Sequence, residues 1–412
     1  ANSNGRSSCL NAKELEAFKF ESFNKTCQIC GNHCELTVNH FSNGAELIAG
    51  NRCERPLKKE QTSVDLPNAY LFKQQLINNA KKQQLQGDFP NGTVGMPLGL
   101  NVYEMYPFWM AFWNKLGYRV QLSPFGSRSL YAKGQHTIPS DTICYPAKLI
   151  HGHIEYLLDK KPDFIFYPCL SYNFNEHLSD NHYNCPVVAY YPEVVEANIE
   201  RVKEIPYKFG FYGLHNPKVM KRQLAKDFCK MLGVDAKAIS AALDEAYRAQ
   251  DAYRGKIKKF TDEAMHYARV HGLPIVVLAG RPYHIDPEIN HGIDKLIQSF
   301  DTVVVSEDGL EYILDDTGTH VLNQWTYHAR LYNAAKVVSK NQDMSLVQLV
   351  SFGCGLDAIT ADEVRDLLEA NEDIYTQIKI DEISNLGTVK IRLRSLFATL
   401  KQRKGRANSD RK

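Results

Sequence analysis

One stretch, residues 139–170, limits what this chain can fold into more than any other. It reads PSDTICYPAKLIHGHIEYLLDKKPDFIFYPCL. A helix-like run (146–158) follows Cys144, and a strand-like run (164–167) precedes Cys169. Strands that alternate with helices are typical of a parallel sheet with right-handed crossovers. Ligands of such sheets collect outside the carboxyl ends of the strands, so two soft sulfur ligands at these positions predict a metal site.

Cys354 repeats this arrangement far downstream. It lies in LVQLVSFGCGLDAITADEVRDLL, where a strand-like run (346–352) ends in Gly-Cys-Gly and a helix begins near Ala361. Cys354 can meet Cys144 and Cys169 only if the carboxyl edges of two sheets face each other across a cleft, where cofactor sites usually lie. Three thiolates would then occupy three corners of a cubane iron–sulfur cluster and leave one iron open. Three separate buried thiols are the alternative.

Two further groups of residues are candidates for this cleft. Cys185 precedes a predicted strand (186–190), so a parallel sheet would place it at the opposite edge, roughly 15 Å away. We therefore keep it as a reserve ligand. Arg281, Tyr283 and His284 follow a glycine turn and are candidate catalytic residues that bind an acidic substrate or move a proton. A turn held by hydrogen bonds from Arg and His is the alternative.

A second cysteine cluster lies near the start of the chain, in CQICGNHCELTVNHFSNGAELIAGNRCE. Its cysteines are Cys27, Cys30, Cys34 and Cys53. The two alternating runs after Cys34 predict a hairpin that turns at Asn43-Gly44 and brings Cys53 back toward the other three. Four thiolates fit either a tetrahedral zinc or a 4Fe–4S cluster. Free cysteines without a metal are the alternative.

The rest of the pattern predicts an α/β fold. We expect two Rossmann-like or flavodoxin-like parallel-sheet domains around a helical middle, with a small N-terminal Cys-rich module. The expected parts are a flexible N-terminus (1–25), the four-Cys module (26–56), a connector (57–91), the first α/β domain (92–192), a helical linker or lid (193–272), the second α/β domain (273–400) and a disordered basic tail (401–412).

Composition excludes several classes of function. The net charge of +2 over 412 residues indicates neither nucleic-acid nor membrane binding. Neither a signal peptide nor an apolar run near the roughly 20 residues of a membrane helix is present, so we expect a cytoplasmic protein. Neither G-x-G-x-x-G nor a phosphate loop occurs. The chain begins with Ala1, which indicates a processed chain or a piece of a longer one.

Several segments resemble the 2-hydroxyacyl-CoA dehydratase and benzoyl-CoA reductase superfamily, closest to the large proteins related to acyl-CoA dehydratase activases. They are TIPSDTICYPAKLIHGHI, DFIFYPCL, NCPVVAYYPEV, GRPYHIDPEINHGI, SFGCGLDAITADEVRDLLE and YTQIKIDEISNLGTVKIRLRSL, spread over roughly residues 92–400. The four-Cys module is also similar to a segment of that branch. The resemblance implies a cluster between two α/β domains, and its cluster cysteines correspond to Cys144, Cys169 and Cys354.

The same resemblance implies a function and partners. It implies a 4Fe–4S cluster, or in some relatives a double-cubane 8Fe–9S cluster, reduced by an ATP-hydrolysing activase. We therefore expect an iron–sulfur enzyme component that accepts low-potential electrons from a separate activase and reduces a small-molecule substrate. Both a monomer and a dimer are compatible with this expectation. A non-catalytic electron-transfer module and a zinc-stabilised binding protein are the alternatives.

Overall fold

The computed structural model describes residues 18–27, 34–42, 44–50, 66–314, 318–351, 353–382 and 386–409, together with Glu16, and the side chains of the last helix as far as residue 402. The chain divides into two compact units, residues 1–62 with 385–388 and residues 63–384 with 389–412. Within the described residues, none of the helices is both long enough and apolar enough to cross a membrane.

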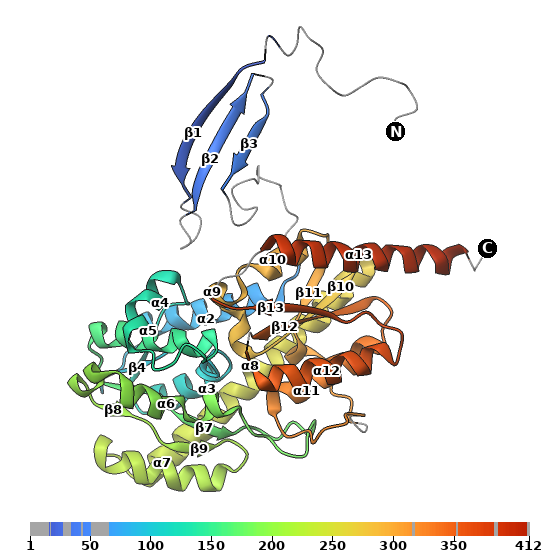
Figure 1. The fold of residues 1–412 in the computed structure, drawn as a ribbon. Coiled ribbons are helices and arrows are strands. Elements are labelled where there is room, and N and C mark those ends of the chain that lie inside the picture. Colours follow the sequence, from blue (N-terminus) through green and yellow to red (C-terminus); the bar gives the residue numbers. More distant parts are fainter. Residues whose placement is uncertain are drawn as a thin grey trace. The chain divides into compact units, whose positions relative to one another are not determined.

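The first unit holds a small antiparallel sheet in the order β1-β2-β3 (Figure 1). Its strands are β1 (Phe20–Thr26), β2 (Glu35–Phe41) and β3 (Glu46–Ala49). Alternation in β2 turns Leu36 and Val38 inward, where they pack with Ile48 and Cys27. The pairing of β2 with β3 confirms the predicted hairpin, whereas β1 was not predicted.

The second unit contains two parallel four-stranded sheets. The first has the order β5-β4-β6-β8, and a separate parallel pair, β7-β9, follows it. The strands are β4 (Thr93–Met96), β5 (Arg119–Leu122), β6 (Phe164–Phe166), β7 (Cys169–Tyr172), β8 (Tyr207–Lys208) and β9 (Phe211–Gly213). The helices of this half are α2 (Ala69–Gln86), α3 (Val102–Lys115), α4 (Arg128–Gly134), α5 (Tyr145–Lys160), α6 (Pro186–Asn198) and α7 (Pro217–Leu232).

The second parallel sheet has the order β11-β10-β12-β13. Its strands are β10 (Ile275–Ala279), β11 (Val303–Val305), β12 (Met344–Ser351) and β13 (Thr376–Ile380). The helices are α9 (Pro287–Asn290), α10 (Ile293–Gln298), α11 (Thr326–Ser339), α12 (Gly355–Glu369) and α13 (Leu386–Ser409). Every residue of β10 and β12 is buried, as expected of central strands in a parallel sheet.

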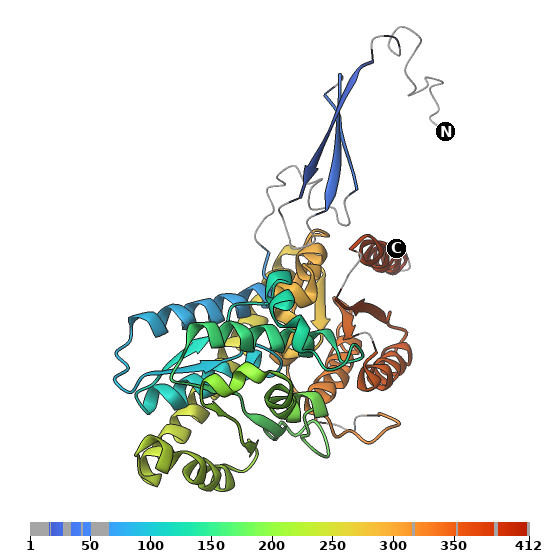
Figure 2. The ribbon, with the colours of Figure 1, turned by 60° about the vertical axis from the view of Figure 1, so that its left-hand side comes forward.

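One long helix joins the two halves. The runs expected over 237–250 and 253–270 form a single helix, α8 (Ala236–His271), capped by Asp235 and ended by Gly272 at a positive φ of 65°. Its N-terminal half packs against α3 and α7, and its C-terminal half packs against β11 (Figures 1 and 2). This helix therefore packs against both halves of the second unit.

The carboxyl edges of the two sheets face each other. The Tyr103 hydroxyl, in the helix after β4, donates to Asp286, which follows β10. Tyr145, at the start of α5, donates to Glu288 over 3.0 Å. Because both pairs join segments that follow strands, the expected opposition of the two edges is present. The α/β fold class is confirmed by these sheets.

Besides β1, several segments differ from the prediction. The strands β8 and β9 lie within residues 193–272, which were expected to be helical. Residues 186–190 are not a strand but the first turns of α6, which begins at Pro186 and buries Val188, Tyr191 and Val195 on one face. Their spacing of three and four residues follows the helical period, and that burial outweighs the strand preference of Val and Tyr. In addition, α13 continues to Ser409, into the segment for which we expected no fixed structure.

Candidate functional site

Three cysteines cap the N-termini of three helices. Cys144 is the N-cap of α5, Cys185 of α6 and Cys354 of α12. Pro186 at the first position of α6 suits this start, because the proline needs no amide partner there. The Cys185 thiol accepts a hydrogen bond from the Val188 amide at 3.5 Å. Each sulfur thus lies where unpaired amides give a helix its positive end.

The three thiols lie near enough to interact electrostatically. Burial, with smaller contributions from the neighbouring Cys185 and Cys354, raises the pKa of Cys144 to about 12. Burial also raises the pKa of Cys185, again with a contribution from Cys354. A helix N-terminus alone would lower a thiol pKa. Here burial outweighs the effect of the helix N-terminus, so the thiols of Cys144 and Cys185 are neutral at pH 7.

A single buried guanidinium acts on all three thiols. Arg281 is 4% exposed, and its Nη2 donates to Cys354 Sγ over 3.5 Å. Its charge lowers the pKa of both Cys144 and Cys185 against the larger effect of burial. Arg281 also pairs with Asp357 in the first turn of α12. The site therefore combines three thiols with one fixed positive charge.

A tight turn fixes Arg281 next to the thiols. Gly280 directly follows β10, and the turn Pro282–Ile285 follows Arg281. The Arg281 amide donates to His284 Nδ1 at 3.1 Å. A side chain at position 280 would collide with the His284 ring, so this close approach needs glycine. The predicted catalytic residues Arg281, Tyr283 and His284 thus lie in one buried turn beside the thiols.

The structure changes the expected position of Cys185. Cys185 begins a helix and not a strand, so the inference that it lies at the far edge of the sheet is wrong. Cys169 starts β7, where its amide donates to the Gly210 carbonyl over 3.0 Å. Burial, followed by the charge of Glu193, raises the pKa of Cys169 to about 12. The structure therefore groups Cys144 and Cys354 with Cys185, and whether Cys169 is a ligand stays a prediction.

The four-Cys module is only partly described. Cys27 is buried at the end of β1 and Cys34 stands before β2, and the Cys27 amide donates to the Cys34 carbonyl over 2.8 Å. Cys30 and Cys53 lie outside the described residues. The predicted zinc or 4Fe–4S site there stays a prediction.

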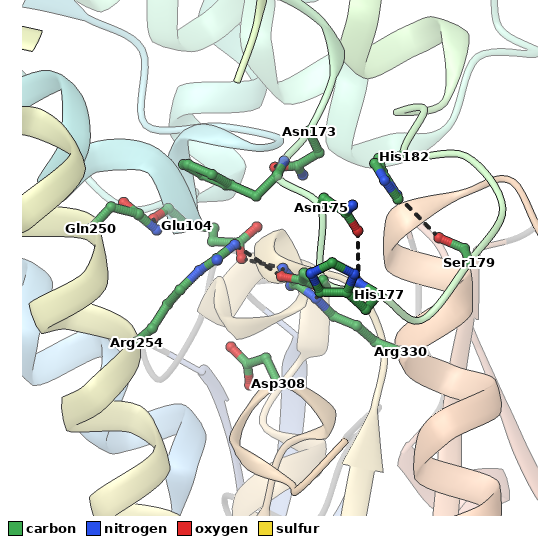
Figure 3. A network of polar contacts seen from close by, with 12 residues as sticks. Glu104, Asn173, Asn175, His177, Ser179, His182, Gln250, Arg254, Asp308 and Arg330 are labelled. Atoms are coloured by element: carbon green, nitrogen blue, oxygen red, sulfur yellow. Dashed lines mark hydrogen bonds and ion pairs between the residues drawn. The ribbon is translucent and has the colours of Figure 1, made fainter. Parts of the chain in front are cut away.

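A charged network that the sequence analysis missed lies at the same facing edges. Arg330 of α11 donates to Glu104 of α3 over 2.6 Å and to both oxygens of Glu176 over 2.6 and 2.8 Å. Arg254 of α8 also donates to Glu176, over 2.9 Å. Arg254 and Arg330 extend toward each other from α8 and α11 (Figure 3). Burial raises the pKa of Glu176, but the two guanidiniums lower it more, so its carboxylate stays charged. The network borders a cavity of about 390 Å³ that Asp308 also lines.

One sequence signal could have pointed to this network. Glu104 lies in VYEMYPFWMAFW and Arg330 in TYHARLYNAAKVV, two helices that are otherwise largely apolar and buried. A lone charge on a buried helix face needs a partner of opposite charge. Sequence alone cannot pair two residues that lie 226 positions apart.

Comparison with known proteins yields one informative match. A family model described as "CoA enzyme activase uncharacterised domain" matches residues 93–310. No curated protein matches the chain. A solved structure, the C-terminal domain of glucosamine-fructose-6-phosphate aminotransferase from Francisella tularensis, is 11% identical, over 80% of this chain and 87% of that one. Its TM-score of 0.18 supports no inference.

The family match corrects two expectations and supports a third. The matching family is named for the activase itself, so a component that accepts electrons from a separate activase and reduces a substrate is wrong. The expected activase partner is wrong for the same reason. The relation to the activases is confirmed, whereas membership of the dehydratase superfamily stays a prediction. Because residues 93–310 are more than half of the 412, this chain belongs to the CoA enzyme activase uncharacterised domain family.

Proposed function

We propose that this protein is an activase that delivers an electron to a CoA-dependent enzyme from an iron–sulfur cluster held by Cys144, Cys185 and Cys354. The observation that carries the proposal is the electrostatic interaction among three thiols at helix N-termini and one buried guanidinium, which donates to one of them. The finer relation to dehydratase-type proteins, which the sequence suggests, belongs to the same proposal.

A donor set made of thiols alone is of the kind that holds iron–sulfur clusters. Among the described residues, no three His, Cys, Asp or Glu side chains lie close enough together to hold one metal ion. Around a tetrahedral zinc the sulfurs approach to roughly 3.8 Å, from Zn–S bonds of about 2.3 Å. In a cubane each thiolate binds a different iron, so the sulfurs stand farther apart. When bound, such a cluster supplies one-electron chemistry that side chains lack.

This chain's own residues supply burial and charge. The three thiols come from both halves, so a cluster would be enclosed between the facing sheet edges and shielded from water. Arg281 provides one positive charge against the negative charge of the thiolates, and Asp357 orients its guanidinium. The helix N-termini add amides that favour negative sulfur.

Anaerobic reconstitution of the full chain tests the proposal. Iron and sulfide should bind in a ratio near one, and reduction should give an EPR signal. Cys144→Ser, Cys185→Ser and Cys354→Ser should each lose the same signal, since they share one cluster. Cys229→Ser is the matched control: this partly buried helical cysteine lies in α7.

Two results would reject the proposal. The ligand assignment fails if Cys169→Ser removes the signal while Cys185→Ser keeps it. The activase role fails if the reduced protein cannot restore an oxidised, inactive CoA-ester-converting enzyme that chemical reduction does restore.

A further inference from the structure

Three buried nitrogen atoms of Arg281 and its two histidine neighbours have no hydrogen-bond partner. They are Arg281 Nε, His284 Nε2 and His328 Nδ1. Their side chains are at most 4% exposed. The three residues are contiguous, because Arg281 contacts His284 through its amide at 3.1 Å and His328 through Nη2 at 3.1 Å. Buried polar atoms are rarely left without a partner, so this group calls for an explanation.

The hydrogen bonds fix which ring nitrogens carry a proton. The Arg281 amide is a donor only, so the His284 Nδ1 that it faces must accept. The Arg281 guanidinium is also a donor only, so His328 Nε2 must accept. Burial and the Arg281 charge lower the pKa of both histidines well below 6.5, so each ring is neutral with one proton. That proton must lie on His284 Nε2 and on His328 Nδ1.

All three unpartnered atoms are therefore N–H donors. We propose that Arg281, His284 and His328 form a donor set that binds an acceptor-only anionic group beside the three thiols. An acceptor-only group fits because a ligand with donors of its own would leave these N–H groups unpaired. The anion has two sources, the sulfide of a cluster on the thiols or a small oxyanion such as a carboxylate. The first source rests on the proposed function, and the second does not.

Two substitutions remove the donors without disturbing the turn. His328→Gln places an amide oxygen near the former Nε2, so Arg281 keeps its acceptor while the Nδ1 donor disappears. His284→Asn places an oxygen near the former Nδ1, so the Arg281 amide keeps its acceptor and the Nε2 donor disappears. His153→Gln is the matched control, because His153 is equally buried but bonds Ser123 at 2.8 Å, away from the thiols.

Two measurements on the full chain distinguish the sources. Calorimetry with acetate and with sulfate measures oxyanion binding to the protein without iron. Each donor variant should weaken that binding about tenfold if an oxyanion is the ligand. The reduction potential of the reconstituted protein reports whether these N–H groups donate hydrogen bonds to the sulfide of a cluster. Each variant should shift it to a more negative value, because hydrogen bonds to sulfur stabilise the reduced cluster.

The outcomes separate this inference from the proposed function. Weakened oxyanion binding in a protein that takes up no cluster supports the donor set and rejects the cluster. An unchanged potential in a protein that does take up a cluster, together with no oxyanion binding, rejects the donor set and leaves the cluster standing. A protein that binds neither anion nor cluster rejects both, and the three donors then serve only ordered water. The donor set would also be rejected if His153→Gln changed oxyanion binding or the reduction potential as much as His284→Asn and His328→Gln do.

Discussion

Replacing Arg330 with methionine should destabilise the second unit more than any single surface change. Arg330 is 1% exposed and holds Glu104 and Glu176 through three short hydrogen bonds. Methionine keeps most of the apolar stem and removes the charge. Glu176 keeps Arg254, but Glu104 loses its cation.

The expected loss follows from these contacts. Three charge-assisted hydrogen bonds at roughly 1.5–3 kcal/mol each would sum to about 4.5–9 kcal/mol, but such terms are not additive. Breaking a buried pair by removing one partner costs about 3–5 kcal/mol, since a charge is left buried alone. Because Arg254 still neutralises Glu176, we expect a value within that narrower range. Adding Glu104→Gln removes the uncompensated charge and should restore about 1–3 kcal/mol relative to the sum of the single changes.

Urea unfolding followed by tryptophan fluorescence measures these energies, because Trp109 and Trp113 are fully buried in α3, one and two turns beyond Glu104. Lys259→Met is the matched control: its pair with Glu263 is exposed and 3.8 Å long, so it should change stability by less than about 0.5 kcal/mol. A loss below about 1 kcal/mol for Arg330→Met, with no coupling to Glu104→Gln, would refute the reasoning.

Two further predictions concern buried positions. Burial, aided by Lys81, lowers the pKa of His153 from 6.5 to about 3, so the unfolded chain binds a proton that the folded one does not, and stability falls as pH falls from 6.5 toward 3. His153→Gln should flatten that slope by an amount that grows as pH falls and approaches about 1.4 kcal/mol per pH unit near pH 5, in unfolding curves at pH 7, 6 and 5. Parallel slopes for the variant and the unsubstituted protein would contradict this prediction. Gly152→Ala should lower the melting temperature, because its new methyl group meets the Leu130 backbone. Gly255→Ala, in an open position of α8, should instead add up to about 1 kcal/mol, and equal effects would refute this contrast.

The sheets were predictable because their signals are local. Runs such as PIVVLAG combine β-branched residues with a glycine stop, and the buried strand β10 occupies that run. The segment PVVAYYPEVVEAN carries two signals at once. Its Val and Tyr residues favour a strand, whereas Val188, Tyr191 and Val195 recur at helical spacing. Tertiary burial decided for the helix, which is why Cys185 was placed at the wrong edge.

The charged network and the donor set were not predictable in the same way. Glu104, Glu176, Arg254 and Arg330 lie in four separate segments, and their pairing depends on how two sheets oppose each other. The orientation of His284 and His328 depends on hydrogen bonds from Arg281 that only the folded chain forms. Sequence identified residues of the right chemistry at the ends of strands. Which of these residues contact one another depends on the tertiary fold.

The thiol site and the Arg330 network depend on the same opposition of sheet edges. Cys144 and Cys185 come from the first half and Cys354 from the second, just as Glu104 comes from the first half and Arg330 from the second. A substitution that weakens the contact between the two halves should therefore also move the three thiols apart. This holds for Arg330 too, although its hydrogen bonds go to Glu104 and Glu176 and not to a thiol. A cluster that bridges the halves would in turn favour the closed arrangement, because a ligand stabilises the state that binds it. Bound iron should consequently raise the unfolding midpoint of Arg330→Met as well as that of the unsubstituted protein, whereas Cys354→Ser should gain nothing from iron.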